Sequence, residues 1–186
     1  MSKSRAFRVA CVASMVACLA ALAPGARADR VHGSLEISFS ATSTLHEFSG
    51  SVPALAVAIE QGPGGGWSGD VDVPVASLGT GIARRDENMR AMLDAAQHPR
   101  IRGRFRDLGP EQVHASGVLP FLLQIRDVER SVQATVSHWQ QDDRSARFDA
   151  EFDVSLREFA LEAPRVLFVR VDDQVHVTVH VTLARS

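Results

Sequence analysis

Cysteine and tyrosine are scarce in this sequence, which has two cysteines and no tyrosine among its 186 residues. Both cysteines, Cys11 and Cys18, lie within the first 28 residues. The rest of the chain therefore cannot form a disulfide, a zinc-thiolate site or a cysteine nucleophile. With only Trp67 and Trp139 added to the phenylalanines, an aromatic platform for carbohydrate is also poorly supplied.

Long apolar runs are also missing after the N-terminus, where no segment approaches the roughly 20 apolar residues that a membrane-spanning helix requires. At the N-terminus itself, Lys3, Arg5 and Arg8 precede a short apolar run that ends near Ala23, and small residues follow. This pattern predicts a cleaved secretory signal peptide over residues 1–28.

We therefore expect residues 29–186 to form one soluble domain in the periplasm, without stable membrane insertion. One alternative stays open. Residues 15–18 (Met-Val-Ala-Cys) loosely resemble a lipoprotein cleavage box, which would leave Cys18 as a lipid-bearing N-terminus.

Basic residues are in the minority. Removing residues 1–28 takes four basic and no acidic residues from a chain with 20 basic and 22 acidic ones, so the formal net charge moves from −2 to −6. A mildly acidic domain without a basic stripe argues against nucleic acid and against electrostatic docking on anionic lipid.

What the sequence does contain is apolar residues that alternate with polar ones, as Leu35, Ile37 and Phe39 do. This period of two recurs along the chain and predicts about eight antiparallel strands in an all-β barrel or sandwich. The glycine-rich residues 62–70 predict a hairpin loop, and Asp172-Asp173 predicts the turn of the last hairpin.

Helical periodicity occurs in one segment, where Met89, Met92, Leu93 and Ala96 have the spacing of one helix face. We expect Asp86 to help begin this helix and Pro99 to end it.

Catalytic and metal-binding patterns are weak. The sequence has no G-x-S-x-G motif, and the adjacent carboxylates Asp142-Asp143 and Asp172-Asp173 are predicted to lie in turns. His176 and His180 share a strand face, but four strand residues separate them by about 13 Å, too far to bind one ion. We predict no catalytic residue, no metal site and no cofactor.

Five stretches resemble the YceI-like family of polyisoprenoid-binding proteins. They are STLHEFSGSV (43–52), VPVASLGTGIARRDENMRAMLDAAQHPRIRGRF (73–105), GVLPFLLQIRDVERSV (117–132) and the closing SLREFALEAP with DDQVHVTVHV. The most specific part is a T-x-I-x-x-R-D-x-x-M-x-x-x-L pattern that runs on to H-P-x-I-x-x-x-F. It comprises Thr80, Ile82, Arg85, Asp86, Met89, Leu93, His98, Pro99, Ile101 and Phe105.

The sequence departs from the family pattern at three positions. His98 stands where an aromatic residue is common before the proline, and Asp127 stands in a turn where glycine is frequent. Pro120 lies in an expected strand, which indicates a sheet edge or a bulge.

The resemblance implies an extended, lipocalin-like antiparallel barrel of about eight strands with one short helix near its mouth. It further implies non-enzymatic binding of a long isoprenoid or similar apolar chain, polyprenyl or quinone-like, in the barrel. Eight strands enclose just enough space for one slender ligand.

The predicted ligand-binding residues fall into three groups. Inward-facing wall residues are Phe39, Phe48, Phe105, Leu119 and Phe152. Residues that close one end are Ile82, Met89 and Met92. Residues that orient the helix or a head group are His46, Arg85 and Asp86, for which an ion pair that pins the helix to the rim is the alternative.

Two other functions stay open at this point. The barrel could be filled by its own side chains and act as an envelope or stress-response interaction module. This stays open because apolar and polar residues alternate in the same way in the sequence of a packed barrel and of a hollow one. A small hydrolase or isomerase would need an acid/base pair that only the fold brings together. A homodimer is also left open.

Overall fold

A computed structural model describes residues 29–43, 46–109, 112, 117–142, 144–162, 165–166 and 169–185. The predicted signal peptide and the lipoprotein alternative at Cys18 lie outside these residues. Among the described helices, none has the length and apolar character to cross a bilayer.

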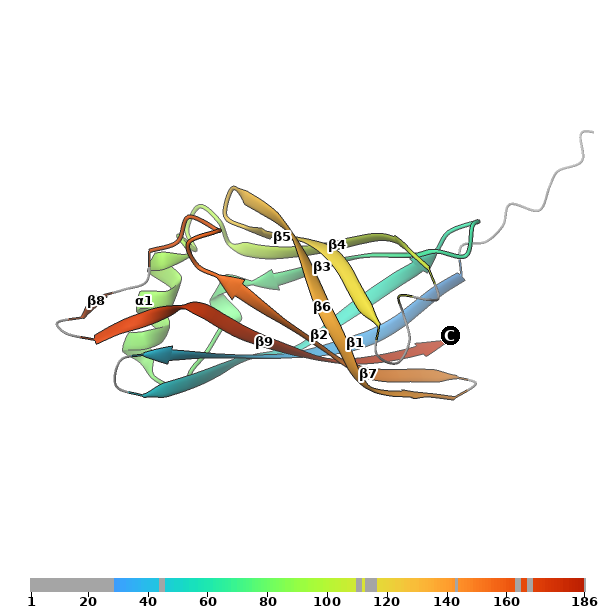
Figure 1. Cartoon of the computed structure of the whole chain (residues 1–186), viewed down its shortest axis with the longest axis horizontal. Helices are drawn as coiled ribbons and strands as arrows, with labels where there is room; N and C mark the ends of the chain where they lie inside the picture. Colours follow the sequence, from blue (N-terminus) through green and yellow to red (C-terminus); the bar gives the residue numbers. More distant parts are fainter. Residues whose placement is uncertain are drawn as a thin grey trace, which may run out of the picture.

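The chain forms one antiparallel sheet with a single α-helix at one end (Figure 1). Its strands are β1 (Asp29–Ser43), β2 (Glu47–Gln61), β3 (Trp67–Pro74), β4 (Arg100–Leu108), β5 (Val118–Ile125), β6 (Val128–Gln141), β7 (Ser145–Ser155), β8 (Arg165–Val166) and β9 (Val169–Arg185). A 3-10 turn, η1 (Val75–Ser77), and the helix α1 (Ala83–Met92) connect β3 to β4.

The sheet closes on itself because β1 pairs with β9 as well as with β2. The strand β8 pairs only with β9, so eight strands form the wall. The prediction of an antiparallel barrel of about eight strands with one short helix is confirmed.

The period-two alternation explains which side chains fill the interior. Leu35 on β1 is buried opposite Leu55 and Val181, whereas its neighbour Glu36 is exposed opposite His180. Successive side chains of a strand point to opposite faces, so one apolar set lines the interior of the barrel.

Two ladders of the described barrel wall are short, the one between β2 and β3 and the one between β4 and β5, beside Pro120. The ladder between β4 and β5 consists of three described pairs, from Arg102 with Gln124 to Arg104 with Leu122. Pro120 lies beyond these pairs and faces Gln133 of β6 alone. The predicted sheet edge is therefore found here, where a residue without an amide hydrogen loses no ladder bond.

Asp172 and Asp173 do not form the predicted hairpin turn, because both lie inside β9. The pairing of β9 with β1 shifts there, from Ala41 with Val175 to Ser43 with Val171. The two aspartates therefore occupy a bulge in a strand that continues past them, since long ladders on both sides outweigh a local turn preference.

The helix also ends earlier than predicted, at Met92 rather than at Pro99. Asp94 has a positive φ of 48° and its amide bonds the carbonyl of Ala91, so the chain leaves the helix there. Ala96 is consequently outside the helix and exposed, contrary to the predicted apolar face.

Buried apolar residues form two clusters, one towards each end of the barrel. The cluster near α1 includes Val75 and Phe159, which are 1% and 2% exposed. The other cluster includes Val136 and Phe148, near the end where the β2–β3 hairpin and the C-terminus lie. Apolar side chains thus line the barrel from one end to the other.

Candidate functional site: an apolar barrel cavity under α1

A cavity of about 450 Å³ lies inside the barrel beneath α1. This is within the range of roughly 300–1,000 Å³ that is usual for sites of small organic ligands. Its inner wall is formed by apolar side chains from strands β1 to β5, β7 and β9. The cavity can therefore hold an apolar molecule out of water.

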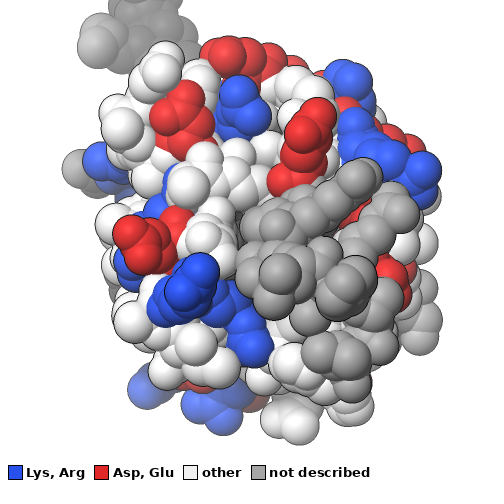
Figure 2. Space-filling view, turned by 90° about the vertical axis from the view of Figure 1, so that its left-hand side faces the viewer, with Lys and Arg blue, Asp and Glu red and all other residues white. Residues whose placement is uncertain are grey.

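Polar side chains of the lining gather at the α1 end. They come from the end of β1, the residue before β2, the loop before α1 and the first two turns of α1: Ser43, His46, Thr80, Arg84, Arg85 and Asn88. Figure 2 faces this end and shows both basic and acidic side chains around it. The site thus has an apolar interior and a polar rim.

The loop before α1 is attached to the barrel and to the helix. Gly79 and Ser51 of β2 exchange two backbone hydrogen bonds, of 2.8 and 3.0 Å. Thr80 donates from its amide (2.8 Å) and its hydroxyl (2.6 Å) to Asp86 Oδ1. These two bonds hold the pKa of Asp86 below its usual value, because they favour the ionised carboxylate, and the bond from the hydroxyl has the larger effect.

Arg85 connects α1 to β2. Its guanidinium lies over the ring of Phe48, 4.6 Å from the centroid, and its Nη2 is 3.4 Å from Nε2 of His46. Ser43 holds His46 in place, because its hydroxyl donates to the His46 carbonyl (2.7 Å) and accepts from the His46 amide (3.3 Å). Arg85 therefore attaches α1 to the barrel rim, as the ion-pair alternative expected. The contact that does so is a cation–π contact with Phe48 and not an ion pair with Asp86.

A smaller cavity of about 190 Å³ lies farther along the barrel. It is bordered by Trp67, Leu108, Phe148 and Leu183, among others, which come from strands of the end opposite α1. Another of its wall residues, Phe105 of β4, is paired with Gly69 of β3. The interior of the barrel is therefore hollow in two places.

The structure brings most of the predicted site residues together. Eight of the eleven border the larger cavity: Phe39, His46, Phe48, Ile82, Arg85, Met89, Met92 and Phe152. Phe105 and Leu119 border the smaller cavity, as Phe152 also does. Asp86 borders neither cavity, since its carboxylate turns back to Thr80.

The rim of the cavity differs from the expectation that the helix turns only its methionines inward. Arg84 and Asn88, which were not predicted, border the cavity beside Met89. Many aliphatic wall residues were also not among the predicted site residues, and most follow the alternation of their strands: Ile37, Val52, Ile101, Leu123, Ile125, Val154, Val175, Val177 and Val179. Alternation could have identified these residues once the inward face of each strand was fixed.

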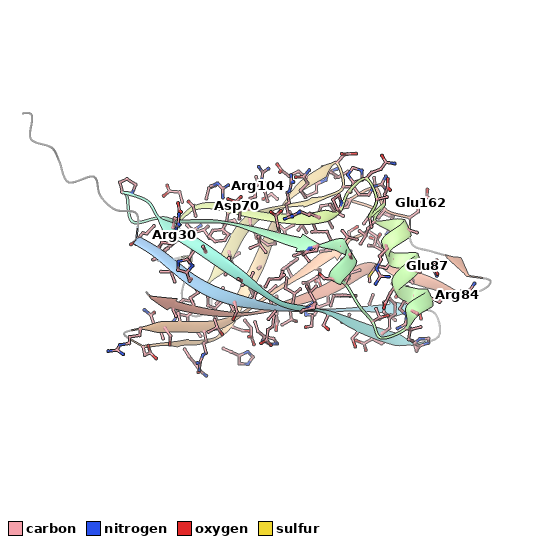
Figure 3. All side chains as sticks on the ribbon, turned by 180° about the vertical axis from the view of Figure 1, so that it is seen from behind. Arg30, Asp70, Arg84, Glu87, Arg104 and Glu162 are labelled. Atoms are coloured by element: carbon pink, nitrogen blue, oxygen red, sulfur yellow. The ribbon has the colours of Figure 1, made fainter. Side chains whose placement is uncertain are left out.

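Charged side chains lie along the outer surface of the wall, as Figure 3 shows for Arg30, Asp70 and Arg104. Arg30 pairs with Glu60, and Asp70 bonds Arg106 across β3 and β4 at 2.7 Å. These pairs are solvent-exposed and contribute little to stability.

A histidine–carboxylate network also lies on the outside. Asp149 of β7 contacts Nδ1 of both His138 (2.9 Å) and His180 (2.5 Å). Partial burial raises the pKa of Asp149. Its hydrogen bonds and charge interactions with His180 and His138 together lower the pKa by more than burial raises it, so the net shift is downward. In the described part of the chain, no three His, Cys, Asp or Glu side chains are grouped so that they could hold a metal ion.

The sequence matches the family model of the YceI-like domain over residues 27–183. The chain belongs to the YceI-like family. No curated protein sequence is significantly similar to it.

Solved structures share the fold of this YceI-like domain. BcnA of Burkholderia cenocepacia is 16% identical with a TM-score of 0.64, over 80% of this chain and 95% of its own. A polyisoprenoid-binding domain from Saccharophagus degradans, implicated in plant cell wall breakdown, is 12% identical with a TM-score of 0.60, over 86% and 99%. The Campylobacter jejuni YCEI protein is 15% identical with a TM-score of 0.57, over 74% and 84%.

Two departures from the family pattern lie against each other in this YceI-like domain. Nε2 of His98, before Pro99, is 3.5 Å from Oδ2 of Asp127 in the β5–β6 turn. The polar His98 thus contacts the polar Asp127, so the two departures from the family pattern are in contact with each other.

Proposed function

We propose that this protein binds one long-chain apolar molecule, an isoprenoid or similar lipid, inside its barrel and does so without catalysis. The observation that carries the proposal is the 450 Å³ cavity with its apolar interior and polar rim. A solved structure of the same fold is described as a polyisoprenoid-binding domain, which supports this class of ligand. We further propose that the protein acts as a carrier in the periplasm.

Apolar burial would supply the affinity. Each methylene-sized group that leaves water contributes about 0.8 kcal/mol, before the costs of association are subtracted. A tail of several prenyl units therefore needs no charged contact inside the barrel. The two cavities favour this proposal over a barrel packed by its own side chains.

The amphiphile would bind in one orientation. Its tail would lie among the aliphatic wall residues, and its polar head would remain at the rim formed by His46, Thr80, Arg84, Arg85 and Asn88. Reversing the molecule would bury the head group without hydrogen-bond partners, which costs free energy.

The helix α1 would cover the tail. Met89 and Met92 border the cavity and are partly buried, and methionine adapts its shape to irregular apolar surfaces. The same helix leaves Ala91 exposed.

The proposal is tested by titrating the protein with a fluorescent prenyl alcohol. The double variant Met89→Asp/Met92→Asp is expected to lose most of the binding, because two carboxylates would replace apolar contacts at the cavity. The matched control Ala91→Asp adds a carboxylate to the exposed side of the same helix and is expected to bind normally. Unchanged binding by a folded double variant would contradict the role of α1, and no binding by the wild-type protein would contradict the proposed function.

A further inference from the structure

The two cavities of the barrel are neighbours that share part of their lining. Six residues border both of them: Ile37, Val73, Ile101, Leu123, Phe152 and Val179. These residues come from six strands, so the boundary between the cavities is a cross-section of the barrel. Phe152 is the one aromatic residue among the six.

Phe152 is supported by a second ring at this boundary. Phe121 of β5 contacts it edge to face, with ring centroids 5.0 Å apart and an interplanar angle of 72°. Phe121 borders only the smaller cavity. The pair therefore lies between about 450 Å³ on the α1 side and about 190 Å³ on the other side.

Other phenylalanines of the lining lie along the wall. Phe39 is paired with Gly50 and Phe105 with Gly69, and each ring occupies the space where a Cβ of that glycine would be. The ring of Phe152 has no glycine to lie over on β9, because its partner there is the branched Val177. Its ring therefore stands against Phe121 at the boundary.

From this geometry we propose that Phe152, backed by Phe121, determines the maximum chain length that the barrel binds. The inference rests on the proposed function. A tail that enters under α1 fills the larger cavity until it meets the Phe152 ring. Longer chains must displace that ring from its edge-to-face contact before they reach the smaller cavity.

The variant that tests the inference joins the cavities. Phe152→Leu removes the ring, keeps an apolar side chain in the wall, and is expected to give one space of about 640 Å³, the sum of the two volumes. Phe159→Leu is the matched control, because it makes the same exchange at a buried ring that borders neither cavity.

The experiment measures dissociation constants for geraniol, farnesol, geranylgeraniol and longer prenols. In the wild-type protein, affinity is expected to rise with each prenyl unit and then to level off. In Phe152→Leu the rise is expected to continue for at least one further unit, with at least about tenfold tighter binding of the first prenol beyond the wild-type plateau. Phe159→Leu is expected to keep the wild-type plateau length.

Several results would overturn the inference. If wild type and Phe152→Leu level off at the same chain length, Phe152 does not limit the chain, although the proposed function stands. If Phe159→Leu extends the plateau equally, the gain comes from general loosening of the barrel. If the wild-type protein binds no prenol of any length, the proposed function fails and this inference fails with it. The wild-type plateau can be measured even if Phe152→Leu folds poorly, and an affinity that rises through every prenol without levelling off would contradict a barrier.

Discussion

The ring of Phe39 on β1 lies over Gly50, the residue paired with it on β2. A Cβ at Gly50 would be 2.3 Å from Cζ of that ring and 2.7 Å from the carbonyl oxygen of Gly79. The glycine thus lets the ring lie along the wall of the larger cavity and lets the loop before α1 approach β2.

Gly50→Ala is therefore expected to destabilise the fold by about 1–3 kcal/mol, the usual cost of overpacking. Urea unfolding measures this change in the free energy of unfolding. The control is Gly64→Ala, where an added Cβ meets nothing within 4 Å, and its effect is expected to stay within about 0.5 kcal/mol. A Gly50→Ala protein as stable as the control would show that the ring and loop move aside freely.

The hydrogen bonds between Asp86 and Thr80 predict a dependence on pH. The pKa of Asp86 is lower in the folded protein than its ordinary value, so the unfolded chain binds more protons in acid. The stabilising contribution is present well above the ordinary aspartate value of 3.8 and is lost as the pH falls through that value towards the folded pKa. Asp86→Asn is expected to lower the Tm at pH 7 and to differ much less from wild type near pH 2.

A second aspartate provides the control for this prediction. The pKa of Asp142 is lowered by hydrogen bonds from the Arg144 amide and from the Ser145 hydroxyl and amide, in the β6–β7 turn far from α1 in sequence. Asp142→Asn should show the same loss of stability at pH 7 without a change in prenol affinity. Asp86→Asn should also weaken prenol binding, because Thr80 and Ile82 border the cavity. Equal prenol affinity in the two variants would contradict this role of Asp86.

Arg85 allows the two interpretations of the rim to be separated. If it pins α1 to β2 through Phe48, Arg85→Ala should destabilise the ligand-free protein by about 0.5–1 kcal/mol. Hydrogen exchange of the α1 amides (Ala83–Met92) should then become faster without any ligand. Unchanged exchange together with weaker prenol binding would instead identify Arg85 as a head-group contact.

The contact between His98 and Asp127 predicts a small coupling energy. Both single variants, His98→Phe and Asp127→Gly, restore residues that are common in the family, and the double variant completes a thermodynamic cycle. The Asp127 side chain is 85% exposed, so we expect a coupling of at most about 1 kcal/mol at neutral pH. A larger coupling would mean that the pair is a structural requirement.

Alternation predicts an all-β barrel or sandwich and identifies inward residues such as Leu35 and Ile37 without knowledge of their partners. The resemblance to the YceI-like family selects the barrel. Local sequence patterns misplace features that depend on longer-range pairing. Asp172-Asp173 has turn chemistry, but β9 continues through it between β1 and β7.

The cavities themselves could not be predicted. Whether a phenylalanine lies along the wall, as Phe39 does over Gly50, or stands inward, as Phe152 does, depends on the residue opposite it. That residue is fixed by the register between strands, which alternation leaves undetermined. Asp86 illustrates the same limit, because its contact with Thr80 depends on the path of the loop.

The central claim is that the barrel holds one long apolar molecule. Native mass spectrometry of the protein purified from its native host, followed by organic extraction, tests this binding directly. One bound apolar molecule per protein chain is expected, and this molecule should pass into the organic solvent on extraction. Protein that arrives empty and also fails to take up a fluorescent prenyl alcohol would contradict the account.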